Sequence, residues 1–168
     1  MKVFVIALSI LMGIITVNPS KTDFNYEKAW KEVEELINSG LPKSALEKTE
    51  EIYKIAESEK NDAQLTKSII YISRLTIVTD EKGMENAIAR LEGMVNKSHA
   101  PVKQISASYL AELYQKYFDN YRCEISQRTE LSGEKGPDFR TWTTQQFLQT
   151  IETWYLFSVN DHSLLKSG

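Results

Sequence analysis

The chain has 168 residues, of which 42% are hydrophobic and 26% are charged, and its formal net charge is -3. This length predicts one domain with an ordinary hydrophobic core, since domains commonly hold roughly 100–200 residues. The slightly acidic charge, with no cluster of lysine and arginine, argues against nucleic acid as a partner.

The first twenty residues, 1–20, have the composition of a secretory signal peptide. Lys2 precedes an uncharged apolar run at 3–17, and Asn18-Pro19-Ser20 ends that run. The run is shorter than the roughly 20 residues that cross a bilayer as a helix, so a permanent anchor is the weaker alternative. We therefore expect export to the periplasm or cell envelope, with membrane contact only if this segment stays uncleaved.

We expect residues 21–168 to form one α-helical hairpin-repeat domain, because the four prolines lie between segments with helical apolar spacing and no segment alternates like a strand. Ser39-Gly40 should end the first helix, and Pro42 should lie in the first turn of the second. The first helix carries Trp30, Val33 and Ile37 on one face, and the second carries the stripe Ala45, Thr49, Ile52, Tyr53 and Ala56.

A second hairpin follows, with Asp62 as the expected cap of its first helix and a break at 79–83. A fifth helix opens after Pro101. The apolar faces of these three helices are expected to be, in chain order, Leu65, Ile69, Ile72 and Leu75 or Thr76; Met84, Ile88, Leu91 and Val95; and Ile105, Tyr109, Leu113 and Tyr117.

The stretch 121–143 is rich in turn formers and predicts a long loop, which Phe139 and Trp142 should hold against the core. A last helix capped by Thr141 or Thr143 follows, with Phe147, Ile151, Trp154 and Tyr155. Hairpins that start near 26, 62 and 101 recur at a spacing close to that of tetratricopeptide arrays, although the repeat consensus is poor. The predicted fold is therefore all-α: stacked helix-turn-helix hairpins in a tetratricopeptide-like solenoid.

The large apolar residues on these faces form the predicted structural core. Its members are Trp30, Val33, Ile37, Ile52, Tyr53, Ile69, Ile72, Leu91, Leu113, Tyr117, Trp142 and Trp154. The aromatic run from Tyr109 to Tyr121 is either part of this core or a ligand platform, and helical spacing favours the core.

The residues predict no catalytic, cofactor or metal site. Cys123 is the single cysteine and has no histidine near it in sequence, so we expect a small buried hydrophobe rather than a nucleophile. The two histidines lack the spacing of a zinc site. Paired carboxylates such as Glu34-Glu35 and Glu50-Glu51 occur in lysine-rich helices, where a solvated face is expected instead of acid-base catalysis. The chain is therefore not expected to be an enzyme.

Several segments resemble the N-terminal helical region of the large alpha-2-macroglobulin family proteins of Bacteroidetes-type bacteria. They are 26–36 (YEKAWKEVEEL), 40–46 (GLPKSAL), 52–56 (IYKIA), 61–65 (NDAQL), 110–114 (LAELY), 128–129 (RT) and 138–142 (DFRTW), in the family's order. Members of that family inhibit endopeptidases by trapping them through a bait region and often a thioester within Cys-x-Glu-Gln. Cys123-Glu124-Ile125-Ser126 does not match that motif, so neither a thioester nor any inhibitory residue carries over.

The resemblance implies a non-catalytic scaffold or docking module at the N-terminus of a longer exported protein involved in protease defence. Its partner would be a protein, either the rest of that polypeptide or another component of the envelope. The alternative is a free-standing secreted tetratricopeptide-like adaptor that binds a peptide or protein.

Overall fold

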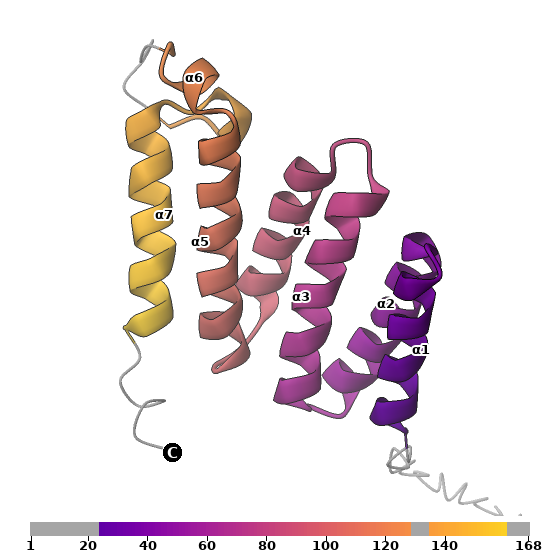
Figure 1. The fold of residues 1–168 in the computed structure, drawn as a ribbon. Helices are drawn as coiled ribbons and strands as arrows, with labels where there is room; N and C mark the ends of the chain where they lie inside the picture. The colour runs from indigo at the N-terminus through magenta and orange to yellow at the C-terminus, as the bar shows by residue number, and fades with distance from the viewer. Residues whose placement is uncertain (1–23, 129–134, 161–168) are drawn as a thin grey trace, which may run out of the picture.

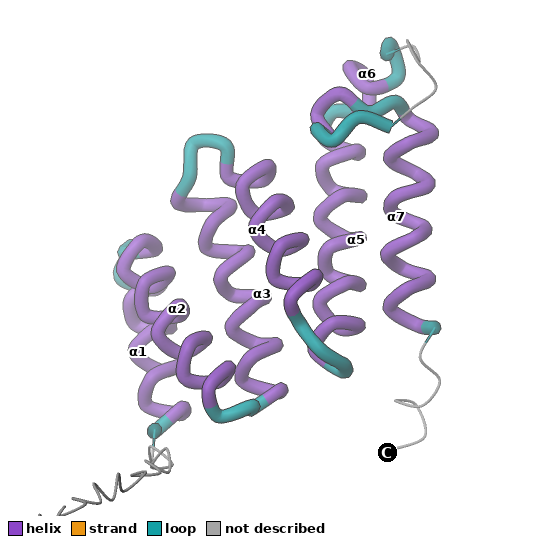
Figure 2. Tube along the Cα trace, turned by 180° about the vertical axis from the view of Figure 1, so that it is seen from behind, coloured by secondary structure: helices purple, strands orange, loops and turns teal. Residues whose placement is uncertain are grey.

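A computed structural model describes residues 24–128 and 135–160, and every regular element in these two ranges is helical (Figure 2). This confirms the all-α prediction. The predicted signal peptide at 1–20 lies outside the described residues. The elements are α1 (Tyr26–Asn38), α2 (Pro42–Ser58), α3 (Asp62–Thr79), α4 (Gly83–Lys97), α5 (Val102–Asn120), the single turn α6 (Arg122–Ile125), the 3-10 turn η1 (Phe139–Thr141) and α7 (Thr144–Val159).

The long helices pack in chain order as a row of hairpins, and α7 completes the row against α5 (Figure 1). Seen from both sides, α1 and α3 lie in one layer while α2 and α4 lie in the other. Besides its sequence neighbours, α3 also contacts α5. The finer assignment to a tetratricopeptide-like solenoid stays a prediction.

Local sequence signals set the helix ends. Asn25 and Asn61 cap α1 and α3, each accepting a hydrogen bond from the backbone amide three residues later. The expected cap of α3, Asp62, is instead its first residue. Gly40 has a φ of 72°, a left-handed conformation that glycine adopts without steric cost, and Pro42 follows at the start of α2.

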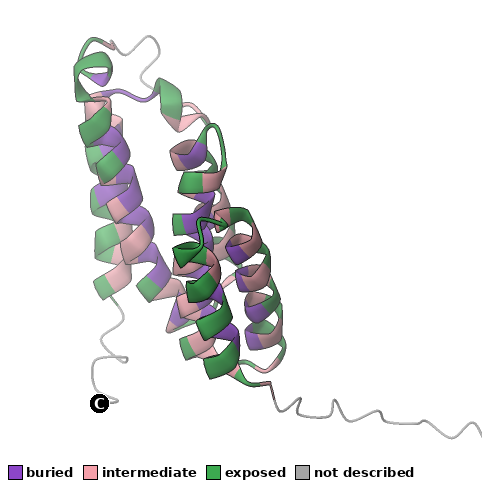
Figure 3. Cartoon of the chain, turned by 45° about the vertical axis from the view of Figure 1, so that its right-hand side comes forward, coloured by how far each residue is buried: buried purple, intermediate pink, exposed green. Residues whose placement is uncertain are grey.

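The buried residues lie along the sides of the helices that face one another (Figure 3), and their side chains form two clusters. The smaller lies between α1, α2 and α3, where Trp30 and Val33 meet Ile52 and Leu75. The larger extends from α2 to α7 and is centred on aromatic residues of α5. Of the predicted core, Trp30, Val33, Ile52, Ile69, Ile72, Leu91, Leu113, Tyr117 and Trp142 are buried, while Tyr53 and Trp154 are half-buried against the larger cluster.

Three residues, Ile37, Ile105 and Tyr155, depart from their predicted apolar faces, and Tyr155 on α7 is 42% exposed. Ile37 was expected in the core, but it is 39% exposed because the last turn of α1 turns it toward the space between α1 and α3. Ile105 was expected on the buried face of α5 and is 48% exposed. Leu113 and Tyr117 of that face are buried as expected, but near the start of α5 the buried positions are Ser106 and Ala107, one and two residues after Ile105.

The stretch predicted as a long loop contains α6 and η1, and its aromatic residues pack as expected. The rings of Phe139 and Trp142 each lie 5.6 Å from that of Tyr114. Thr143 is the N-cap of α7, and it forms a capping box with Gln146. The expectation for Cys123 is wrong: it is exposed, because the single turn of α6 buries Ile125 instead.

Candidate functional site

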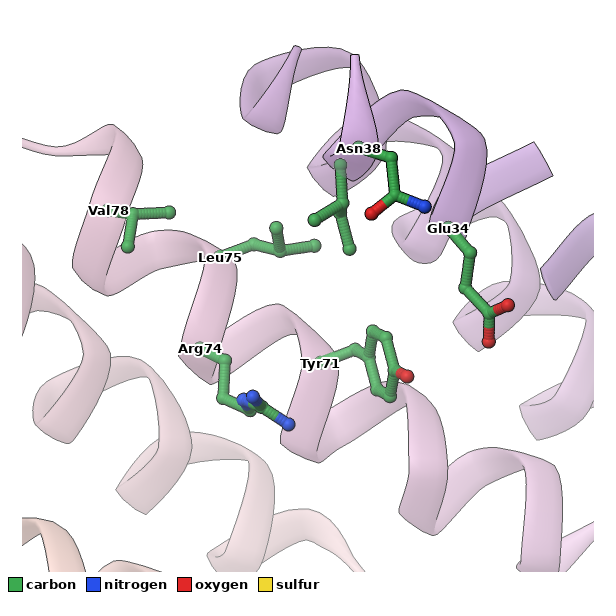
Figure 4. Close-up of a pocket in the computed structure, with 7 residues that line it drawn as sticks. Glu34, Asn38, Tyr71, Arg74, Leu75 and Val78 are labelled. Carbon is green, nitrogen blue, oxygen red and sulfur yellow. The ribbon is translucent and has the colours of Figure 1, made fainter. Parts of the chain in front are cut away.

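A groove of about 520 Å³ separates α1 from α3 on the layer that these helices share (Figure 4). This volume falls within the roughly 300–1,000 Å³ typical of ligand pockets. We call it the α1–α3 groove, and its lining consists of Glu34, Ile37, Asn38, Tyr71, Arg74, Leu75 and Val78.

Helical spacing explains why these side chains share the groove. Glu34, Ile37 and Asn38 are related by i, i+3 and i+4 on α1, so they lie on one face of the helix. The wall from α3 repeats this spacing at positions 71, 74, 75 and 78. Because α1 and α3 run in the same direction (Figure 1), the last turns of both helices meet at one end of the groove.

That end of the groove is apolar and open to solvent. Ile37 and Val78 are 39% and 65% exposed, whereas Leu75 between them is 5% exposed and belongs to the smaller core cluster. Exposed aliphatic side chains above a buried one form an apolar surface, and covering that surface with a partner is favourable because it removes apolar area from water.

Trp30, which precedes the groove residues on α1, supports Tyr71 of the groove lining. Its indole Nε1 donates a hydrogen bond of 2.6 Å to Oε1 of Gln64, and its ring centroid lies 4.9 Å from that of Tyr71. The ammonium of Lys67 lies 4.1 Å from the same indole. These contacts connect α1 to α3 and fix Tyr71 in the wall.

The groove carries opposite charges on its two walls. Glu34 lies on α1 and Arg74 on α3, and neither makes an ion pair with any residue that the structure describes. The guanidinium of Arg74 lies 5.9 Å from the ring of Tyr71. Its charge also acts on two groups of α5, where it opposes the rise in pKa that burial causes for Tyr109 and that a hydrogen bond to a carboxylate causes for Lys116.

A groove on the opposite layer, between α2 and α4, is crossed by an ion pair. Its volume is about 480 Å³, and Arg90 on α4 donates a hydrogen bond of 2.6 Å to Oε1 of Glu50 on α2. This pair neutralises two of the charges of the second groove, which Lys54, Glu57 and Lys97 also line. In the α1–α3 groove, Glu34 and Arg74 are both exposed and no such pair crosses between the walls.

The residues weighed for catalysis do not come together. Glu34 and Glu35 are exposed, Glu50 pairs with Arg90, and exposed Cys123 lies on α6. Nε2 of His99, in the turn between α4 and α5, lies 2.9 Å from Oδ1 of Asp62 at the start of α3. This histidine is far from Cys123 along the chain. Within 24–128 and 135–160, no group of three or more histidine, cysteine or acidic side chains could hold a metal ion.

The aromatic run on α5 belongs to the core, as its spacing favoured. Tyr114, Tyr117 and Phe118 are buried and pack around Phe147 of α7. Burial, together with the nearby carboxylate of Glu92, raises the pKa of Tyr114 above its usual range. These rings therefore offer no platform to a ligand.

Sequence reasoning missed the α1–α3 groove. The available signal was α3 itself, whose apolar residues occur on more than one side: Tyr71 and Val78 lie outside the stripe that packs against α2 and α4. A helix that is apolar on several sides either packs on several sides or exposes part of that surface.

Comparisons with protein-family models, with curated proteins and with solved structures gave no match to this chain. Among the described helices, none combines the length and the apolar character needed to cross a membrane.

Proposed function

We propose that this chain is a non-catalytic helical scaffold that binds a peptide segment of a protein partner in the α1–α3 groove. The observation that carries the proposal is the pair Ile37 and Val78, two aliphatic side chains exposed on facing helices above the buried Leu75. A side chain inserted there would be removed from water on several sides, which contributes about 1.5–3 kcal/mol for one aliphatic residue.

The contact between Trp30 and Tyr71 favours binding, because it holds one side chain of the groove lining in place before the ligand arrives. Trp30 is 5% exposed, and the Gln64 hydrogen bond and the Tyr71 ring contact hold it in place. A preformed site keeps more of the contact energy as affinity, since association otherwise costs about 0.5–1.5 kcal/mol per side chain that must be immobilised.

The wider setting of this scaffold rests on resemblance alone. Segments such as 26–36 and 61–65 are similar to the N-terminal helical region of Bacteroidetes-type alpha-2-macroglobulin proteins. We extend the proposal accordingly: the module docks an exported protein of that kind to its own remaining chain or to an envelope partner. In the alternative, a free-standing secreted adaptor, the same groove holds the peptide.

Peptide display against the purified segment 21–168 tests the proposed function without assuming a ligand. The groove variant carries Ile37→Ser and Val78→Ser, and the matched control carries Leu148→Ser and Leu156→Ser, two exposed aliphatic residues of α7. We expect selected peptides to bind the wild type and the control alike. Binding to the groove variant should weaken at least tenfold, which corresponds to about 1.4 kcal/mol.

Circular dichroism and thermal unfolding establish that both variants keep the fold. The proposal is wrong if no peptide is enriched, or if the selected peptides bind the folded groove variant as well as the wild type.

A further inference from the structure

Resting on the proposed function, we infer that the bound segment combines one aliphatic side chain with a neighbouring acidic and basic pair. The acidic residue faces Arg74 on α3, the basic residue faces Glu34 on α1, and the aliphatic residue occupies the end formed by Ile37, Leu75 and Val78.

The first step in the argument is the position of the two charges. Glu34 lies one turn before Asn38 on α1, and Arg74 lies one turn before Val78 on α3. Because the two helices run in the same direction, both charges lie on the N-terminal side of the aliphatic end (Figures 1 and 4). A segment lying along the groove therefore meets the aliphatic surface and the charged walls within a few residues.

The second step is that neither charge forms an ion pair within the described part of the chain. On the opposite layer, Glu50 and Arg90 pair across the α2–α4 groove at 2.6 Å. Other surface carboxylates are also engaged, as Glu32 and Glu51 are by Lys48 at 3.1 and 3.2 Å. Glu34 and Arg74 have no such partner in the described ranges, so a ligand with complementary charges can pair with both.

The third step concerns selectivity. A ligand with two acidic groups would be attracted by Arg74 but repelled by Glu34. A ligand with two basic groups would be attracted by Glu34 but repelled by Arg74. Juxtaposed like charges suppress wrong partners more strongly than matched charges raise affinity. An extended segment points successive side chains to opposite sides, so neighbouring acidic and basic residues reach opposite walls.

The probe is an array of synthetic nonapeptides, each with one leucine beside two charged positions at spacings of one to three residues. Four sets carry one acidic and one basic residue, two acidic residues, two basic residues, or two serines. We expect the mixed-charge set to bind the wild-type segment best, by about two- to fivefold over each other set, as exposed ion pairs allow. This preference should vanish in concentrated salt, which screens exposed charges.

Charge-reversal variants give a result that a purely structural role could not produce. Arg74→Glu should transfer the preference to the two-basic set, and Glu34→Lys should transfer it to the two-acidic set. The controls are Lys43→Glu and Glu47→Lys, exposed residues of α2 outside the groove, and they should keep the wild-type preference.

The outcomes separate this inference from the function on which it rests. If leucine peptides bind in the groove with the same affinity in all four sets, or if the charge reversals leave the preference unchanged, the inference is wrong and the proposed function stands. If no peptide of the array binds and display also enriches none, the proposed function itself fails.

Discussion

At the scale of single residues, Trp30 connects the first helix to the third. The sequence placed it on the apolar face of the first helix and in the predicted core, and the structure buries it in the smaller core cluster. Its polar and ring contacts, however, all go to α3: Gln64 accepts from the indole, Tyr71 packs beside it and Lys67 lies over it. One side chain therefore stabilises the core and supports Tyr71 in the lining of the α1–α3 groove.

Trp30→Ala should lower the free energy of unfolding by roughly 3–5 kcal/mol, because it leaves a cavity and removes the partner of Gln64. Urea denaturation followed by circular dichroism measures this change. Trp154→Ala is the matched comparison, since Trp154 is only half-buried on α7, and it should cost clearly less. Equal effects of the two substitutions would show that Trp30 does not have the structural role assigned to it.

At the scale of elements, substitution by alanine should have opposite effects on stability at the two glycines of α4. A Cβ added at Gly83 would lie 2.1 Å from the backbone oxygen of Ile77, whereas a Cβ at Gly93 would meet nothing within 4 Å. Gly83 is thus needed where the turn from α3 brings two backbones together. Gly93 only weakens a helix that continues to Lys97.

Gly93→Ala should therefore raise the free energy of unfolding by about 1 kcal/mol, the difference in helix propensity between the two residues. Gly83→Ala should lower it, because backbone atoms of α3 would have to move. Thermal unfolding of the two variants beside the wild type tests both signs in one experiment. A stable Gly83→Ala protein would contradict the close approach of α3 to α4.

The helices differ in how far the sequence could predict them, and packing explains the difference. The predicted stripes of α2 and α4 match most of their buried faces, because Ile52 on α2 and Ile88, Leu91 and Val95 on α4 mark those faces. On α5, buried Ser106 and Ala107 shift the face away from Ile105, and small residues give no hydrophobic signal of their own. Ile37 was misplaced for a related reason: apolar spacing identifies a face but not whether another helix covers it.

The candidate site was harder to predict than the fold because it depends on α1 and α3 lying side by side. Glu34 and Arg74 are ordinary surface charges in the sequence, and only the layer arrangement places them on opposite walls. The aromatic anchor of the loop before α7 could be predicted, since Trp142 and Phe139 are large apolar residues among turn formers. A contact between distant helices leaves no comparable pattern in sequence.

At the scale of the whole molecule, two half-buried tyrosines make stability sensitive to alkaline pH. Burial and a hydrogen bond to Glu59 raise the pKa of Tyr26 to about 12, and burial with a bond to Glu57 raises the pKa of Tyr53 to about 12. The unfolded chain releases these protons near pH 10. Between pH 10 and 12 the folded state holds more protons than the unfolded state, so stability falls as pH rises.

We expect the urea midpoint to be unaffected by these tyrosines below about pH 9 and to decrease from about pH 10 upward. Absorbance at about 295 nm follows ionisation of the phenols in the same samples. The double variant Tyr26→Phe and Tyr53→Phe should show a shallower decrease, because fewer phenols then differ in pKa between the two states. A decrease of equal slope in the variant would mean that other groups govern alkaline unfolding.

The proposed role of the whole module as a scaffold predicts that it neither traps nor cleaves proteins by itself. In the family that the sequence resembles, trapping needs a bait that is cleaved and a body that closes around the protease, and neither is a property of a row of helical hairpins.

The purified segment 21–168 should be incubated with a panel of endopeptidases, and residual activity measured on a small and a large substrate. We expect either simple digestion of the segment or no effect on the enzymes, with both substrates hydrolysed at unchanged rates relative to each other. Selective loss of activity on the large substrate is the signature of a trapped protease, and it would overturn the scaffold assignment. Heat-unfolded segment serves as the control, because it competes as a substrate but holds no folded surface.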